Sequence, residues 1–477
     1  MLYSYDMEKK YYPTIGLEVH AEMSTVSKMF CACKNDPDET RPNVNICPVC
    51  MAHPGTLPVI NKKAVENVIK VGLAINATIA TDFTEFDRKN YFYPDIPKGY
   101  QISQYKFPIV SGGKLAGVDV TRIHLEEDTG TSKHDKGDFS LVDYNRAGVP
   151  LMELVTEPVI HDAETAARFG KELQLLLQYL GVSEANMEKG EMRVEANISL
   201  SDTPDKFGTK VEVKNLNSFR SVERAIKYEL ARMKDLYEAG RQDEIVQETR
   251  GWDETKQVTF SQRKKEDSHD YRYFPDPDLP KLVLKEVFDM NELKTNLPEL
   301  PDAKRARYRD SFGIKDEDIE TFVNDIELGK WFEEVAGILG DKEKIKIAAN
   351  YTTSDLLGLK KNDASAQTPK ASSFAELIGM LAEGTMSSRG AKDVLAVLVK
   401  EDISPMKYAE EHDMIQKNDE GALKEIAQKI IDANPAVVAT YKSGKENALM
   451  SLVGQIMKET KGSANPQLVQ KILKELI

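Results

Sequence analysis

Residues 15–22 read IGLEVHAE, and the interpretation of the whole chain starts from this stretch. Successive side chains of a β-strand point to opposite faces, so one face of this segment is apolar and the other is ionisable. The ionisable face carries Glu18, His20 and Glu22. This alternation is typical of an antiparallel sheet with one packed face and one polar face. It raises the question of why a strand near the N-terminus aligns carboxylates with an imidazole.

The same alternation recurs through the first 295 residues, for example in RVEANISL (193–200) and KVEVKNLN (210–217). One clear helix interrupts it after Asp162, with apolar residues at helical spacing and Gly181 at its end. From about residue 296 onward, helical patterns replace the strand patterns. We therefore predict an α+β fold in which a mainly antiparallel body is followed by all-helical parts. The predicted domains are a body (1–295), a helical domain (296–405) and a small helical tail domain (406–477).

Composition indicates an ordinary globular protein of 477 residues, with 41% hydrophobic and 30% charged residues. No apolar run approaches the ~18 residues that a membrane-spanning helix needs, and the N-terminus lacks the apolar core of a signal peptide. We expect a cytoplasmic protein with no membrane contact. The net charge of −14 argues against a protein coated in nucleic acid. It leaves room for RNA binding through a local basic surface.

The four cysteines form two close pairs within a loop, residues 31–50. Cys31 and Cys33 give C-x-C, and Cys47 and Cys50 give C-x-x-C. Two such pairs suit a tetrahedral zinc site with four sulfur ligands, which is a structural rather than a catalytic arrangement. The alternative is four ordinary thiols. Structural disulfides are disfavoured in a reducing cytosol.

Two further segments place ionisable side chains on one strand face. In TRIHLEED (121–128) the polar face consists of Arg122, His124, Glu126 and Asp128. In PLMELVTEP (150–158), Glu153 shares a face with Glu157. Carboxylates and a histidine from separate strands could converge on one Mg²⁺ or Mn²⁺ ion, because these cations prefer oxygen ligands. The alternative is a solvated sheet face with surface ion pairs. Phosphate-binding P-loop and G-x-S-x-G motifs are both absent from the sequence.

Longer motifs carry a family resemblance. FDRKNYFYPDIPKGYQISQY (86–105), DYNRAGVPLMELVTEP (143–158) and HDYRYFPDPDLP (269–280) resemble the B subunits of bacterial aspartyl/glutamyl-tRNA amidotransferases. The resemblance extends to GLEVH (16–20) and to MSLVGQIMKETKGSANPQLV (450–469), and so spans nearly the whole chain. The cysteine quartet is similar to that of the zinc-bearing members.

The resemblance implies a glutamine synthetase-like body and a carbon–nitrogen ligase activity that depends on glutamine. Such B subunits use ATP and Mg²⁺ to phosphorylate the side-chain carboxylate of Glu-tRNA(Gln) or Asp-tRNA(Asn). Ammonia then displaces phosphate and forms the amide. The implied partners are an amidase, which releases ammonia from glutamine, and a small third subunit, in a heterotrimer that binds aminoacyl-tRNA. Which of the two tRNAs is the substrate, the ammonia path and the interfaces within the heterotrimer stay open.

Carried over by motif, the catalytic metal ligands implied here are His20, Glu153 and either Glu126 or Glu127, with Glu18 close by. The alternation favours Glu126, because it shares a face with His124. That preference would fail if a β-bulge interrupted the strand.

Phosphoryl transfer needs cations to share the developing charge. The candidates for binding ATP phosphates are Arg88, Lys89, Lys98, Arg193 and Lys214. The alternative for each is a solvated surface side chain. Lys89 is favoured because it lies inside the longest motif.

An acidic protein must concentrate its positive charge to hold RNA. In the C-terminal tail the candidates for tRNA contact are Lys442, Lys445, Lys458 and Lys461. The family pattern implies contact with the outer corner of the tRNA, whereas the alternative is charged helix faces in solvent. Two competing functions remain at this stage: a self-contained ATP-dependent ligase for a free small molecule, and a non-catalytic tRNA-binding scaffold.

Overall fold

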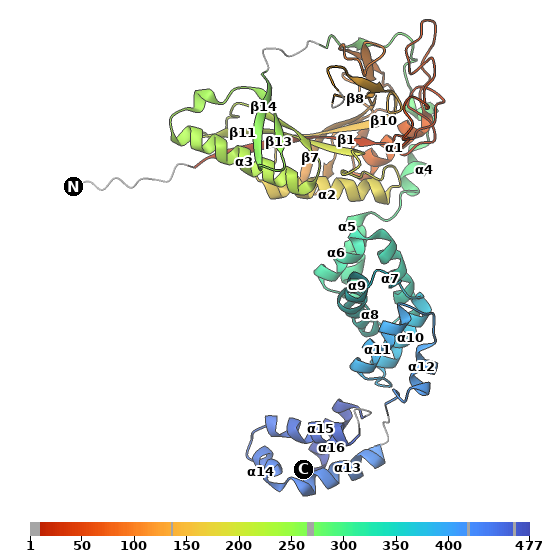
Figure 1. Ribbon diagram of the computed structural model, residues 1–477, viewed down its shortest axis with the longest axis vertical. Coiled ribbons are helices and arrows are strands. Elements are labelled where there is room, and N and C mark those ends of the chain that lie inside the picture. The colour runs from red at the N-terminus through yellow and green to blue at the C-terminus, as the bar shows by residue number, and fades with distance from the viewer. Residues whose placement is uncertain (1–9, 135–136, 265–270, 417–419, 461–463) are drawn as a thin grey trace, which may run out of the picture. The chain divides into compact units, whose positions relative to one another are not determined.

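The computed structural model describes residues 10–134, 137–264, 271–416, 420–460 and 464–477. The chain forms two compact units, residues 1–300 and 301–477 (Figure 1). The first unit ends five residues beyond the predicted boundary at 295, because helix α4 (Met290–Thr295) and the segment after it pack on the first unit's core. In the described part of the chain, every helix is too short or too polar to cross a bilayer.

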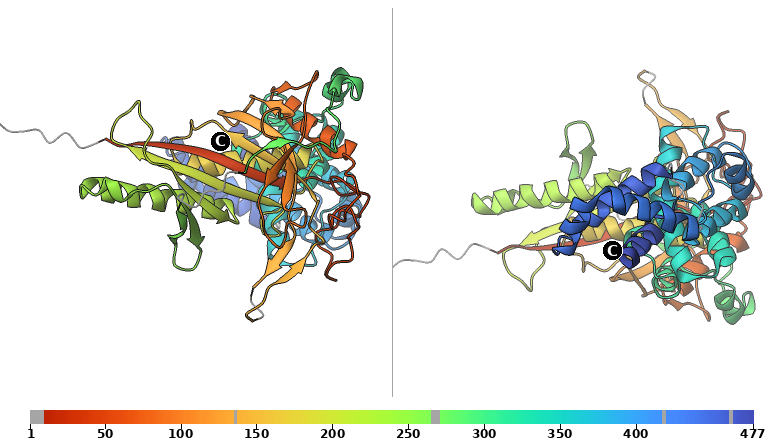
Figure 2. Two further views of the ribbon diagram at one scale, coloured as in Figure 1. Left: turned by 90° about the horizontal axis from the view of Figure 1, so that it is seen from above. Right: turned by 90° about the horizontal axis from the view of Figure 1, so that it is seen from below.

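A ten-stranded mixed sheet forms the first unit, and its strands are antiparallel neighbours except for one parallel pair, β12 and β13. Strand β1 lies between β11 and β10 (Figure 2, left). In spatial order the strands are β14 (Val258–Lys264), β13 (Glu248–Asp253), β12 (Val211–Leu216), β11 (Met192–Ser201), β1 (Tyr12–Glu22), β10 (Pro150–Thr156), β7 (Val118–Glu127), β5 (Val110–Ser111) and β2 (Thr78–Ile79), with β6 (Lys114–Leu115) also paired to β7.

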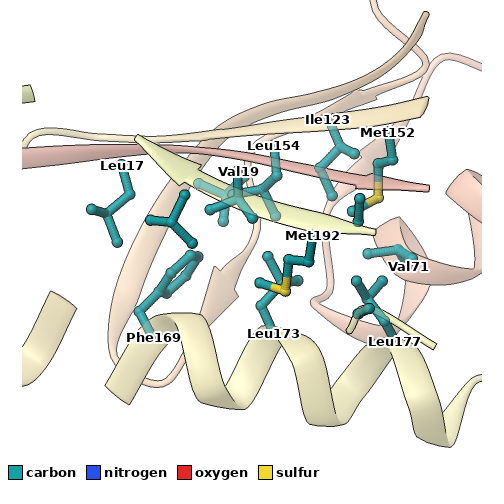
Figure 3. Packing of buried hydrophobic residues seen from close by; sticks show 14 of the residues in the cluster. Leu17, Val19, Val71, Ile123, Met152, Leu154, Phe169, Leu173, Leu177 and Met192 are labelled. Atoms are coloured by element: carbon teal, nitrogen blue, oxygen red, sulfur yellow. The ribbon is translucent and has the colours of Figure 1, made fainter. Parts of the chain in front are cut away.

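Two long helices, α2 (Ala163–Tyr179) and α3 (Phe219–Glu238), lie along one face of this sheet (Figure 1). Asp162 caps α2 by accepting a hydrogen bond from the Thr165 N–H, as the sequence predicts. The apolar residues of β1, led by Leu17 and Val19, pack on Phe169 and its neighbours in α2 (Figure 3). Because side chains alternate along β1, the ionisable residues lie on the opposite face, which these helices leave uncovered.

Smaller elements border that uncovered face. A three-stranded sheet has the order β15 (Phe274–Pro275), β3 (Asp87–Asn90) and β4 (Tyr100–Ser103), and β8 (Thr131–Lys133) pairs with β9 (Leu141–Asp143). The cysteine loop lies between β1 and helix α1 (Lys62–Ala74).

The second unit is helical, in agreement with the change of pattern near residue 296. Its helices are α5 (Pro301–Arg307), α6 (Asp316–Asn324), α7 (Ile326–Leu339), α8 (Lys342–Asn350), α9 (Leu357–Asn362), α10 (Ala371–Ala382), α11 (Ser388–Leu398), α12 (Pro405–Glu411), α13 (Glu420–Ala433), α14 (Pro435–Lys442), α15 (Asn447–Glu459) and α16 (Pro466–Leu476). Helices α13, α15 and α16 share an apolar core that includes Leu423, Leu452 and Ile472. A separate tail domain after about residue 405 stays a prediction.

Candidate functional site

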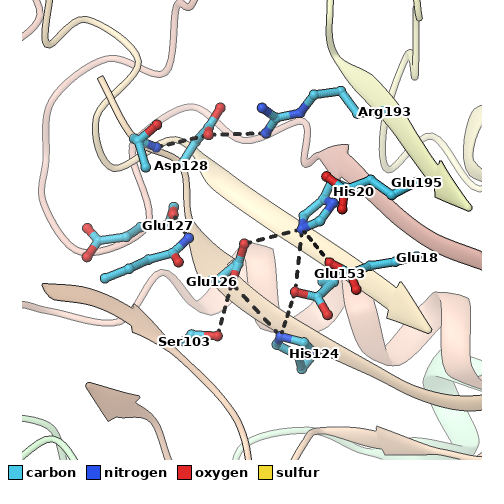
Figure 4. Close-up of polar contacts among 12 residues, drawn as sticks. Glu18, His20, Ser103, His124, Glu126, Glu127, Asp128, Glu153, Arg193 and Glu195 are labelled. Carbon is cyan, nitrogen blue, oxygen red and sulfur yellow. Dashed lines mark hydrogen bonds and ion pairs between the residues drawn. The ribbon is translucent and has the colours of Figure 1, made fainter. Parts of the chain in front are cut away.

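The ionisable residues of three adjacent strands meet on the uncovered face of the large sheet (Figure 4). The strand register explains the meeting. His20 of β1 lies opposite Glu153 of β10, and Glu153 lies opposite His124 of β7. Directly opposed side chains of neighbouring strands are close enough to interact. Glu18, two residues before His20, reaches the same cluster from the same face of β1.

The distances within the cluster are short. His20 Nε2 lies 3.4 Å from Glu153 Oε2, 3.7 Å from Glu126 Oε1 and 3.8 Å from Glu18 Oε1. The Ser103 hydroxyl donates to Glu126 Oε2 at 3.0 Å and so fixes that carboxylate. Glu126 and Glu153 are buried, at 2% and 5% exposed, so their charges are shielded from water.

Burial, hydrogen bonds and neighbouring charges shift the pKa values of the acids and bases in this cluster. Burial, followed by the carboxylates of Glu153 and Glu195, raises the pKa of Glu18 to about 7. Burial would lower the pKa of His20, but the hydrogen bond to Glu153 and the nearby carboxylates outweigh it and raise that pKa to about 9. Burial also opposes ionisation of Glu153, yet the two histidines hold its pKa well below the usual value. The cluster therefore concentrates negative charge that a cation would stabilise.

The donor set fits a divalent cation. Ligand atoms of Glu18, His20 and Glu153 all lie within 4.8 Å of one another, and the same holds for His124, Glu126 and Glu153. Mostly carboxylate oxygens with an imidazole suit Mg²⁺ or Mn²⁺. In addition, Nδ1 of the buried His124 has no hydrogen-bond partner among the described residues.

Glu126 and Glu127 point to opposite sides of β7. Glu126 faces His20, whereas Glu127 accepts hydrogen bonds from the Lys98 ammonium at 2.8 Å and the Ile102 N–H at 2.9 Å. The irregularity in the pairing of β7 with β10 lies near Val155, at the far end of the strand. Alternation is therefore intact where the two glutamates lie.

A cavity of about 540 Å³ opens beside the cluster. Its lining includes Glu18, His124 and Glu153, together with the cations Lys89 and Lys214. The Lys214 ammonium is paired with Glu195 at 2.6 Å. The Lys89 ammonium lies 5.3 Å from the centre of the Tyr271 ring and forms no ion pair within the described residues. It is therefore available to an anion in the cavity.

The other three candidate cations are engaged elsewhere. Arg88 binds Asp276 and Asp278, each at 2.9 Å, and Lys98 binds Glu127. Arg88 and Lys98 line a second cavity of about 290 Å³ beside the cysteine loop. Arg193 lies 3.3 Å from Asp128 (Figure 4).

The four cysteines converge as the two-pair spacing predicts. All four sulfur atoms lie within 4.8 Å of one another, and Cys47 Sγ is 3.8 Å from Cys50 Sγ. A zinc ion at about 2.3 Å from four tetrahedral sulfurs separates those sulfurs by about 3.8 Å, so the site fits zinc. The buried Lys28 ammonium donates to the Asn45 carbonyl at 2.7 Å and holds the loop in place.

Sequence reasoning did not identify every residue of the site. Glu195 and Glu212 form a further acidic group with Glu18, and Tyr271 and Tyr273 line the cavity. Glu195 lies opposite Glu18 in the β1–β11 register, but that register is not readable from one strand's alternation. The tyrosines are in the quoted motif at 269–280, although no spacing rule indicated a role for them.

The predicted tRNA-binding lysines lie in the second unit. Lys442 ends α14, Lys445 follows it and Lys458 is near the end of α15. All three are exposed and form no ion pair within the described part of the chain. Lys461 lies outside the described residues.

Comparison with known proteins gives matches over nearly the full chain. Residues 13–289 match the family described as the GatB/GatE catalytic domain, and residues 330–477 match the GatB domain. The chain is 44% identical to the B subunit of the aspartyl/glutamyl-tRNA(Asn/Gln) amidotransferase of Persephonella marina, covering 98% of this chain and 99% of the relative. The corresponding protein of Brevibacillus brevis is 43% identical over 98% and 99%.

A plant relative is also similar. The chain is 43% identical to the B subunit of the chloroplastic/mitochondrial glutamyl-tRNA(Gln) amidotransferase of Sorghum bicolor, covering 97% of this chain and 86% of the relative. With such identity along both matched regions, the chain belongs to the GatB family, the B subunits of aspartyl/glutamyl-tRNA amidotransferases.

Proposed function

We propose that this chain activates and amidates the side-chain carboxylate of misacylated Glu-tRNA(Gln), Asp-tRNA(Asn) or both. The observation that carries the proposal is the cluster of Glu18, His20, Glu126 and Glu153 beside a cavity with a free lysine. It occurs in a chain that aligns from end to end with proteins named for this reaction.

The chemistry explains the residue types. A carboxylate is a poor electrophile, because ammonia cannot expel oxide from it. Transfer of the γ-phosphoryl group of ATP to a carboxylate oxygen leaves ADP and creates an acyl phosphate. Ammonia then attacks the carbonyl carbon, phosphate leaves with the C–O bonding electrons, and the nitrogen loses a proton to give the amide. Catalysis of such transfers rests on positioning and charge neutralisation.

The residues take distinct roles in this proposal. Glu18, His20, Glu126 and Glu153 hold Mg²⁺, which when bound neutralises phosphate oxygens. Lys89 and Lys214 approach the transferred phosphoryl group from the cavity wall. Glu127 orients Lys98 on the other side of β7, and Arg88 and Arg193 keep their carboxylate partners.

The finer architecture belongs to the proposal as well. A glutamine synthetase-like body carries the reaction, because that fold activates the same carboxylate with ATP. Cys31, Cys33, Cys47 and Cys50 bind a structural zinc ion, supported by their sulfur separations. The partners are an amidase and a small third subunit in a cytoplasmic heterotrimer. The helical tail, with Lys442, Lys445, Lys458 and Lys461, contacts the tRNA.

One assay separates this function from its two alternatives. The chain, assembled with its partner subunits, is given ATP and glutamine with Glu-tRNA(Gln), with Asp-tRNA(Asn), with free glutamate or with none of these. We expect ATP turnover and amide formation with the charged tRNA only. Turnover with free glutamate would identify a small-molecule ligase, and tRNA binding without ATP turnover would identify a scaffold.

A further inference from the structure

A group of tyrosines on the wall of the large cavity has no role in the chemistry above. Tyr105 and Tyr273 both line the cavity, and their rings are stacked with centroids 4.5 Å apart and planes at 15°. Tyr271 lies next to them, with its ring 6.2 Å from that of Tyr273. Aromatic side chains serve as platforms on which nucleobases stack, because every base has a π-face.

The small sheet β15-β3-β4 fixes these rings in place. The Tyr105 N–H donates to the buried Asp87 carboxylate at 2.9 Å, so the residue is anchored to β3. The Asn90 N–H, at the end of β3, donates to the Tyr271 carbonyl at 2.9 Å. Tyr273 directly precedes β15, which pairs with β3. The rings are therefore positioned before any ligand binds.

The outermost ring is left open. Tyr105 is 60% exposed although Tyr273 covers one of its faces, so its other face is accessible. An aromatic face left open beside a cavity is available to stack on a planar ligand. Burial, partly offset by the nearby Lys89, raises the pKa of Tyr273 to about 12, so its ring stays neutral at physiological pH.

We propose that Tyr105 and Tyr273 form a stacking platform for an unpaired adenine. This inference rests on the proposed function, in which both substrates carry such a base. ATP ends in adenine, and the amino acid of an aminoacyl-tRNA is esterified to the 3′-terminal adenosine. In ATP the ribose and phosphates join the adenine to the γ-phosphoryl group, and in aminoacyl-tRNA the ribose joins the adenine to the amino acid. Each of these reacting groups must reach the carboxylate–histidine cluster. The adenine of the bound substrate stacks on the open face of Tyr105 and so extends the stack that Tyr105 forms with Tyr273.

Fluorescence of 2-aminopurine, which falls when the base stacks on an aromatic ring, tests the platform directly. One arm uses 2-aminopurine riboside triphosphate, and the other uses tRNA with 2-aminopurine at its 3′ end, each with the complete heterotrimer. We expect quenching in the wild type and in Tyr105→Phe, and its loss in Tyr105→Ala and Tyr105→Leu. The arm that shows quenching identifies the source of the adenine.

Kinetics provide the second readout. Loss of a stacked base typically weakens binding about 5- to 150-fold, so Tyr105→Ala should raise the KM of one substrate by that factor with little change in kcat. Tyr105→Phe, which keeps the aromatic ring, should have the wild-type KM. Phe92→Ala is the matched control, since Phe92 is 87% exposed in the motif at 86–105 but lies outside the cavity lining.

Different outcomes would overturn the tyrosine platform and the proposed amidation function. Quenching in neither arm, or unchanged KM values in both Tyr105→Ala and Tyr105→Leu, overturns the platform. If the wild-type complex still amidates tRNA in that case, the proposed function stands. A wild-type complex that forms no amide with ATP and Glu-tRNA or Asp-tRNA overturns the function itself.

Discussion

His20 lies at the centre of the carboxylate cluster, since its Nε2 is within 4 Å of three carboxylates. Replacement of His20 or Glu153 by alanine should abolish amide formation on the tRNA. Removal of a group that stabilises charge in the transition state costs about 2–4 kcal/mol, or roughly a hundred- to a thousand-fold in rate. Single-turnover amidation at saturating Mg²⁺ measures the effect.

Glu157→Ala provides the matched control for these variants. Glu157 follows β10 directly, but its carboxylate is bonded to the Thr121 hydroxyl at an exposed position. We expect near wild-type turnover, and zinc content should be unchanged in all three variants. Wild-type rates for both His20→Ala and Glu153→Ala would refute the assigned metal site.

At this scale the sequence predicts which side of a strand a residue faces but not its partners. Alternation places Glu126 with His124 and Glu127 on the other side, as the structure does. It cannot distinguish Lys89, which is free to meet an anion, from Arg88, its neighbour in the same motif. Arg88 pairs with Asp276 and Asp278, almost 200 residues away in sequence, and only the tertiary fold brings them together.

At the scale of single elements, the cysteine loop should depend on zinc. We expect about one equivalent of zinc in the purified protein, with sulfur ligands at about 2.3 Å. Cys47→Ser combined with Cys50→Ser should remove the metal and expose residues 31–50 to proteases, because metal binding is coupled to folding of such loops. Elemental analysis and limited proteolysis are the measurements.

His20→Ala is the control for the zinc prediction, because it removes a ligand of the other proposed metal. It should retain the full zinc content and a protected loop. Freshly reduced wild-type protein with no zinc and four freely reactive thiols would contradict the assignment.

Helix α7 carries an acid whose ionisation should stabilise the second unit. Burial opposes ionisation of Glu333, but Arg307, Lys304 and the Tyr308 hydroxyl bind its carboxylate and lower its pKa below the usual 4.5. A lowered folded-state pKa gives stability above pH ~4.5 that is lost as the pH falls through the folded pKa. The advantage of wild type over Glu333→Gln should therefore shrink from pH 7 to pH 3.

Urea denaturation of the full chain measures this difference. Trp331 lies in α7 and reports on that unit, in a background where the other tryptophan, Trp252, is replaced by phenylalanine. If the difference in free energy of unfolding between wild type and Glu333→Gln stays constant over this pH range, the charge of Glu333 does not stabilise the second unit. Its contribution would then come from packing.

Elements defined by local signals were the most predictable. Asp162 caps α2 where the sequence places the start of that helix, because a cap depends on neighbours within four residues. The parallel pairing of β12 with β13 was not predicted, because it requires α3 to return the chain to the same edge. The small sheet that holds the tyrosines was also missed, since β15 has only two residues.

For the whole molecule, deletion of residues 406–477 should weaken tRNA binding and leave the first unit folded. The helices after residue 420 have their own apolar core, so the large sheet does not rely on them. Binding of the truncated form should also become less salt-sensitive, by roughly one unit of slope for each phosphate that the protein no longer binds. Filter binding of aminoacyl-tRNA at several salt concentrations measures both effects.

A full-length variant with Lys442, Lys445 and Lys458 changed to glutamine distinguishes the loss of the tail's positive charges from the loss of the tail itself. It should reproduce most of the decrease in salt dependence, because these lysines are exposed and unpaired within the described residues. Unchanged affinity and salt slope in the truncated form would identify the tail as an assembly element, with its lysines as solvated helix faces.

The central position of β1 has a consequence for biosynthesis. Its partners are β10 and β11, which end at Thr156 and Ser201, so β1 is synthesised about 180 residues before its second neighbour is complete. At about 5–20 residues per second this lasts roughly 10–40 s. Throughout that time Leu17 and Val19 have no complete sheet to join. Nascent chains arrested before β11 has emerged should therefore recruit chaperones and be cleaved readily by protease, and chains arrested well beyond it should resist.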